Sequence, residues 1–404
     1  MKKLTLFAFT VNQTVGVGFL GLPYAFQHSG MIYSIIVLAF CCYLSYYVGT
    51  LAVEIIFKDY EIKVPLHGKK LKQYVQLVDD HHSIIICALL TIFGSGCALA
   101  FSLIFASSMS LNIPLPYFPT CDIYDTAHPE CLINFRIYLT IFIISTYILA
   151  LRGVHEQKSV QLLMAFLRLL LVTTLVLVAL YRIISGVSTE PISIINPSEI
   201  ESTFSVIVYA VVYHHALPSI AQICEDSIIE MPKLVTWAIF ISYALVGTII
   251  GIAFPNVSAQ CNLSYGYLDG VFGEIIKIIV MILPATDVIA SGPVVVIMIT
   301  ENILGYFHEK SRTYEVLVIS CIVAILYSVA FFMQDLFGVI DAAGMSMIAI
   351  VFLYIPVIHL KHWREDASAR HDSKDFHHMI SYFVMGVSIF YMTYRLVLVI
   401  YSLV

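Results

Sequence analysis

Long hydrophobic stretches dominate this 404-residue chain and leave little sequence between them. Each is too long and too apolar for a strand, and about 20 apolar residues are enough for a helix to cross a bilayer. Only 12% of the residues are charged, against about 25% in an ordinary soluble domain, so the chain cannot build a polar surface. Because lipid offers no hydrogen bonds to the backbone, each hydrophobic stretch must satisfy its own backbone groups as a helix. We therefore expect eleven membrane-spanning helices. They cover 4–30, 31–57, 83–110, 135–151, 160–181, 202–225, 234–254, 271–300, 314–333, 337–358 and 379–403.

These stretches use most of the chain, which leaves no sizeable soluble domain. We therefore predict one transmembrane domain over 1–404, an all-α polytopic protein of about eleven helices. The first five stretches form one half, at about 4–181, and the next five form a second half, at about 202–358. An extra helix follows at about 379–403. No basic run is long enough to indicate nucleic-acid binding, so the expected surroundings are the lipid bilayer.

The distribution of basic residues predicts the orientation. Sixteen of the 21 Lys and Arg residues fall on one side of the predicted helices, which the positive-inside rule assigns to the cytoplasm. Lys2 and Lys3 lie on that side, and no small-residue cleavage site of a signal peptide follows them. We expect a cytoplasmic N-terminus and an extracellular or luminal C-terminus, in either the plasma membrane or an endolysosomal membrane.

Two predicted outer loops carry features of an oxidising, glycosylating compartment. Asn256 and Asn262 each begin an Asn-x-Ser sequon, which predicts a glycoprotein. Cys121 and Cys131 lie in another outer loop, and a disulfide between them is the favoured pairing. Cys261 makes the number of outer cysteines odd, so the sequence leaves the pairing open.

The first predicted helix is weakened at mid-membrane. Gly16, Gly18 and Gly21 follow one another closely and Pro23 comes next, a pattern that disfavours a continuous helix. Such glycines also allow close helix packing, which is the alternative interpretation.

The sixth predicted helix has a similar interruption, where Tyr213, His214 and His215 precede Pro218. The two interruptions therefore fall in the first helix of each five-helix half. Discontinuous helices in corresponding positions are typical of inverted-repeat transporters with a binding site at the midplane. Half-helix N-termini attract a carboxylate and half-helix carbonyl ends attract an ammonium group, so a zwitterionic amino acid fits both.

The same residues carry a family resemblance. The run GVGFLGLPYAF at 16–26 resembles the first-helix signature of the amino acid/auxin permease family, and YHHALPS at 213–219 is similar to its sixth-helix motif. The double histidine and the segment 283–293 are most similar to the branch called transmembrane protein 104. The resemblance implies a leucine-transporter type of fold, a five-plus-five inverted repeat with discontinuous helices 1 and 6. It also implies symport of amino acids with sodium or protons.

The resemblance implies roles for residues of helix 1. The residues of the substrate-binding break would be Val15, Gly16, Val17 and Gly18. Asn12 matches an asparagine of a cation site in the sodium-coupled neutral amino acid branch.

The matching position on helix 8 stays open between Thr286, Asp287 and Ser291, because Pro284 and Pro293 are spaced differently here. This departure leaves sodium coupling in question.

Two ionisable residues lie inside predicted spans, where each costs about 2.5–3.5 kcal/mol to insert. Arg168 belongs to span 5 and Asp287 to span 8. In the leucine-transporter fold these helices meet at the cation site. We therefore expect Arg168 to stand where a sodium ion would bind and Asp287 to accept the coupling proton. A permanent structural ion pair and an Arg168 that extends to water are the alternatives.

His214 and His215 sit in the helix 6 break, where one could bind substrate or carry protons, or could satisfy freed carbonyl groups. Adjacent helical residues point about 100° apart, so at most one faces a cavity unless the helix is unwound. Tyr213 is a candidate wall of the pocket.

The chain is predicted not to be an enzyme. Its His pairs lack the spacing of di-iron sites, lie at different depths and predict no metal site or other cofactor. Neither a nucleophile motif nor a phosphate loop is present. The predicted function is a secondary active transporter of amino acids, coupled to a cation with the proton favoured over sodium. The alternative is a membrane amino acid sensor of the same fold, which the short cytoplasmic segments disfavour. The oligomeric state is open.

Overall fold

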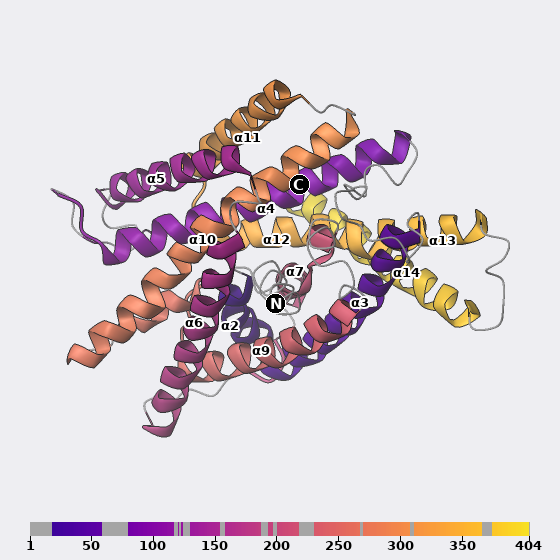
Figure 1. Ribbon diagram of the computed structural model, residues 1–404. Helices are drawn as coiled ribbons and strands as arrows, with labels where there is room; N and C mark the ends of the chain where they lie inside the picture. The colour runs from indigo at the N-terminus through magenta and orange to yellow at the C-terminus, as the bar shows by residue number, and fades with distance from the viewer. Residues whose placement is uncertain are drawn as a thin grey trace.

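A computed structural model of the chain describes residues 18–58, 80–116, 120, 123, 130–153, 158–186, 193–196, 200–217, 230–266, 270–307, 311–365 and 374–403. The elements of this part are all helical (Figure 1). The α-helices are α2 (Gly18–Ser29), α3 (Met31–Lys58), α4 (Asp80–Asn112), α5 (Glu130–Arg152), α6 (Lys158–Ile184), α7 (Ile200–Val211), α9 (Met231–Ala253), α10 (Gly270–Tyr306), α11 (Arg312–Phe332), α12 (Leu336–Ala349), α13 (Ile355–Glu365) and α14 (Lys374–Leu403). The short ones are η4 (His214–Ala216), η6 (Cys261–Tyr265) and the π-helical η7 (Ile350–Tyr354).

Each of the eleven predicted stretches contains a described helix, although 4–17 of the first and 218–225 of the sixth lie outside the described residues. The tenth is made of α12, η7 and α13, which follow one another without a gap. Eight of these helices are long and apolar enough to cross a membrane, which confirms a polytopic membrane protein. Helix α7, by contrast, ends at Val211, and two non-helical residues follow it. The sequence predicted an interruption in this helix, whereas the interruption predicted at 15–18 lies largely outside the described residues.

The helices pack in two groups (Figure 1). One group holds α4, α5, α10 and α11, and the other holds α2, α3, α7 and α9. Between the groups, α6 packs on both α9 and α10, while α12 packs on both α4 and α7. The last helix, α14, lies against α12 and α13.

Small residues set the distance between several of these helices. A Cβ atom on Gly94 of α4 would lie 2.5 Å from Ile299 of α10, and one on Gly96 would lie 2.6 Å from Ala343 of α12. Glycine at these positions lets the backbones approach closely, which is how membrane helices gain packing energy.

The loop between α9 and α10 folds back into the protein. Gln260 is fully buried, accepts a hydrogen bond from Ser107 and donates one to Ser108 of α4. Asn262 is also fully buried and donates to Ser108 at 3.5 Å. Asn256 is exposed. Of the two predicted glycan sites, the folded loop therefore leaves Asn256 accessible and buries the Asn262 amide.

Cys131, at the start of α5, is disulfide-bonded. Its predicted partner, Cys121, lies outside the described residues. Cys261 is a free, buried thiol, so it does not take part in this pairing.

Candidate functional site: the helix 6 break and a buried ion pair

The sixth helix is interrupted where the sequence predicted. Helix α7 ends at Val211, two non-helical residues follow, and the chain resumes as the single 3-10 turn η4. The hydroxyl of Ser45 on α3 donates to the carbonyl of Val211 at 3.0 Å. In return, His214 Nε2 lies 3.0 Å from the carbonyl of Ser45 and donates to it. Helix α3 therefore satisfies groups that the break frees, as a lipid-embedded backbone requires.

The two histidines point to different neighbours. His214 stacks on Tyr213, with ring centroids 4.6 Å apart, and faces α3. His215 packs on Phe93 of α4, with ring centroids 4.7 Å apart. The Nδ1 atom of His215 is buried and has no hydrogen-bond partner within the described part of the chain. His214 thus has a structural contact, whereas His215 is the histidine directed at the interface between the two helix groups.

Tyr209 and Phe93 extend this interface, with ring centroids 6.0 Å apart. Gly18, the first residue of α2, lies directly against α7: a Cβ atom on it would be 2.9 Å from Cα of Ala210 and 3.1 Å from Cδ1 of Tyr209. Helix α2 therefore meets α7 backbone to backbone, one residue before α7 ends. Sequence reasoning did not find Phe93, because an aromatic residue within an apolar span carries no local signal.

The other predicted residues of the helix 1 break lie outside the described residues. They are Asn12, Val15, Gly16 and Val17.

A buried ion pair joins α6 to α10. Arg168 Nε donates to Asp287 Oδ2 at 3.0 Å, and Nη2 of the same guanidinium also contacts this oxygen. The Arg168 and Asp287 side chains are 1% and 8% exposed. The second oxygen, Asp287 Oδ1, is buried without a hydrogen-bond partner in the described part of the chain. The structure thus brings together the two ionisable residues that the sequence placed at membrane depth.

The other helix 8 candidates differ in their surroundings. Helix α10 continues through Pro284 and Pro293 without an interruption. Thr286 donates to the carbonyl of Leu283 at 2.9 Å, which is an ordinary contact within the helix. Ser291 is buried at 7% exposure and makes no hydrogen bond to another described residue. Of the three, Asp287 alone engages a charged partner in the described structure.

A second ion pair joins α14 to α12. Arg395 of α14 contacts Asp341 of α12 at 2.5 Å, and both side chains are mostly buried. Nearby, the hydroxyl groups of Ser205 on α7 and Tyr391 on α14 lie 2.8 Å apart. These contacts attach the extra helix to two helices beside the break. The sequence signals were the two charged residues inside apolar spans, but their pairing could not be read from it.

The geometry agrees with what sequence comparison finds. A family model described as "transmembrane amino acid transporter protein" matches residues 2–400. The chain belongs to this family. Transmembrane protein 104 of Mus musculus is 22% identical over 189 residues, covering 45% of this chain and 37% of that protein. Its Caenorhabditis elegans homolog is 24% identical over 334 residues, covering 73% of this chain and 66% of that protein.

The human protein of the same name is 22% identical over 248 residues, covering 57% of this chain and 49% of that protein. The chain therefore spans between about a third and two thirds of the length of these relatives. Family membership confirms the resemblance that the first-helix and sixth-helix motifs indicated.

Proposed function

We propose that this member of the transmembrane amino acid transporter family is a secondary active transporter, which moves amino acids by alternating access and couples that movement to a cation. The observation that carries the proposal is the close contact of α2 with α7 at the helix 6 break, in a protein that also buries an Arg168–Asp287 ion pair between α6 and α10. A zwitterionic substrate needs charged or dipolar partners at the midplane, and interrupted helices supply them.

The packing of the helices supports a five-plus-five inverted repeat. If the second repeat starts at α7, the counterparts are α2 with α7, α3 with α9, α4 with α10, α5 with α11 and α6 with α12. Each of the first four helices packs against its own counterpart. The fifth pair follows the same rule: α6 contacts α9 and α10, while the α12–α13 helix contacts their counterparts, α3 and α4. A two-fold relation between the halves produces this reciprocity.

The Arg168–Asp287 pair favours a proton over sodium as the coupling ion. The guanidinium of Arg168 occupies the space between α6 and α10, which are helices 5 and 8 of the predicted fold. A sodium ion bound there would be repelled by the positive charge of Arg168. A proton on Asp287 removes the negative charge that holds Arg168, and a carboxylic acid can then donate to a different acceptor. Protonation therefore changes the contact between α6 and α10, the two helices that join at this point.

Uptake into liposomes that contain the purified protein tests the proposal. Radiolabelled amino acids are supplied while a pH gradient and a sodium gradient are imposed separately. Proton-driven accumulation supports the proposal as stated, and sodium-driven accumulation keeps the transporter but moves the cation site to Asn12 with Thr286 or Ser291. Binding without accumulation under either gradient contradicts transport and supports an amino acid sensor.

The two histidines provide an internal comparison. His215→Ala is expected to raise KM for uptake and to cost less stability than His214→Ala, because the His215 ring packs on Phe93 but its Nδ1 atom has no hydrogen-bond partner among the described residues. His214→Ala is expected to cost about 1–3 kcal/mol of stability, because it leaves the Ser45 carbonyl without its side-chain donor. The reverse pattern would assign the substrate contact to His214.

A further inference from the structure

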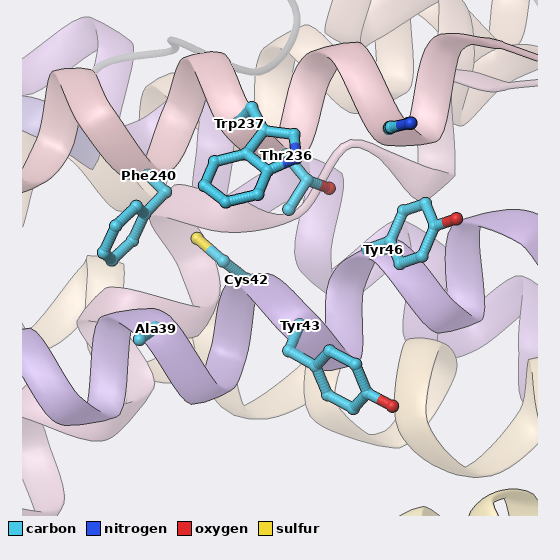
Figure 2. Close-up of a pocket in the computed structure, with 8 residues that line it drawn as sticks. Ala39, Cys42, Tyr43, Tyr46, Thr236, Trp237 and Phe240 are labelled. Atoms are coloured by element: carbon cyan, nitrogen blue, oxygen red, sulfur yellow. The ribbon is translucent and has the colours of Figure 1, made fainter.

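A groove on the outer surface of the α3–α9 pair lies outside the proposed transport site. Its volume is about 370 Å³. Figure 2 shows aromatic side chains from both helices along it, with the Cys42 sulfur directed toward Trp237 and Phe240. The residues that line it are Ala39, Cys42, Tyr43, Tyr46, Lys233, Thr236, Trp237 and Phe240.

The groove opens toward the lipid. The Tyr43 and Trp237 side chains are 52% and 60% exposed, and their apolar neighbours Ile36 and Ile241 are 62% and 53% exposed. In a membrane protein, exposed apolar side chains of spanning helices face acyl chains. The molecules that reach this groove are therefore membrane lipids.

The two helices run antiparallel. Gly49 of α3 lies beside Pro232, at the start of α9, whereas Gly251 near the end of α9 contacts Met31 at the start of α3. One end of the groove therefore lies near the start of α9, beside Gly49 of α3. The other end lies further along α9 and therefore deeper in the membrane. The first end lies on the side that holds most Lys and Arg residues, which the positive-inside rule assigns to the cytoplasm.

The polar groups of the groove gather at that first end. Lys233 and Tyr46 lie there, while Ala39 and Phe240 line the far end, seven residues away along each helix or roughly 10 Å. Lys233 is exposed and has no ion-pair partner among the described residues, and the exposed Glu230 one turn earlier does not pair with it. A cation at the membrane surface followed by an apolar slot is complementary to an anionic headgroup followed by an acyl chain.

We propose that this groove binds an acidic phospholipid of the cytoplasmic leaflet. Lys233 and the Tyr46 hydroxyl hold the headgroup phosphate, and one acyl chain lies over Ala39, Cys42 and Phe240. The aromatic side chains on both helices form the walls.

The groove and the helix 6 break share a wall. Thr236 lines the groove, and its buried hydroxyl group faces the hydroxyl group of Tyr213. Tyr213 belongs to the break, and its buried hydroxyl group also lies against Gly49 of α3. A lipid seated in the groove therefore braces the α3–α9 pair directly behind the break.

Native mass spectrometry of the purified protein in detergent tests the site without any need for transport. Phosphatidylserine, phosphatidylcholine and cholesterol are added separately at equal concentrations. We expect phosphatidylserine to bind about fivefold more tightly than phosphatidylcholine, the factor that corresponds to the ~1 kcal/mol of one basic residue near the surface. Lys233→Ala is expected to abolish this preference, and Ala39→Trp, which fills the deep end, to weaken both phospholipids.

Matched controls are Lys158→Ala, on the same side of the membrane at the start of α6, and Ala324→Trp, on the exposed surface of α11. Both should bind lipid as the wild type does. Equal binding of the two phospholipids to wild type, a preference that survives Lys233→Ala, or cholesterol that displaces phosphatidylserine would each overturn the proposal. Because the headgroup comparison uses the unmodified protein, it remains decisive even if one variant does not fold.

Discussion

The Arg168–Asp287 pair allows a quantitative prediction about stability. Both side chains are almost fully buried, so removal of either partner leaves one uncompensated charge at membrane depth. Arg168→Met and Asp287→Leu are each expected to lower the free energy of unfolding by about 3–5 kcal/mol. The double variant removes both charges, and replacement of a whole buried pair by apolar residues is usually neutral or stabilising by about 1–4 kcal/mol. The free energy of unfolding of the double variant should therefore be no more than about 1 kcal/mol below that of the wild type.

Reversible unfolding in mixed detergent and dodecyl sulfate, followed by circular dichroism, measures these four proteins as a double-mutant cycle. The expected coupling energy is at least about 5 kcal/mol, because the summed cost of the two single variants disappears in the double variant. Additive effects would show that the two side chains do not interact. An Asp287→Leu variant as stable as the wild type would show that Arg168 reaches water without its partner. The double variant also separates roles, since it should fold but lose proton-driven uptake.

Three further outcomes follow from burial and close packing. Asn256→Gln should remove a glycan and increase electrophoretic mobility. Asn262→Gln should leave the glycan unchanged and reduce thermal stability, because it disturbs a buried amide. An unchanged mobility of the Asn256→Gln variant would show that the exposed sequon is not used. Gly18→Ala should cost about 1–3 kcal/mol by forcing α2 from α7, whereas Gly386→Ala, with nothing within 4 Å, should be neutral or stabilising in the same unfolding assay. Cys131→Ser should add one maleimide-reactive thiol to the unreduced, denatured protein although one cysteine has been removed, since it releases the disulfide partner.

The positions of the helices could be predicted from the sequence because the information is local. A run of about 20 apolar residues has one stable arrangement in a bilayer, whatever its neighbours are. The interruption before His214 was also visible, since polar residues and a nearby proline weaken a helix wherever it packs. The motifs of helices 1 and 6 were specific enough to indicate the family.

The partners across helices depended on the tertiary structure. Arg168 and Asp287 could be placed inside membrane spans from the sequence, but their contact requires α6 and α10 to be neighbours, which is a property of the packing. The sequence predicted that at most one of His214 and His215 faces the cavity unless the helix is unwound, but it did not say which. In the structure, His215 faces the interface between the two helix groups, and His214 faces α3. Asn262 looked like its sequon neighbour, yet the loop folds inward and buries it. Local composition fixes which segments lie in the membrane, whereas side-chain environments are set by residues more than a hundred positions away.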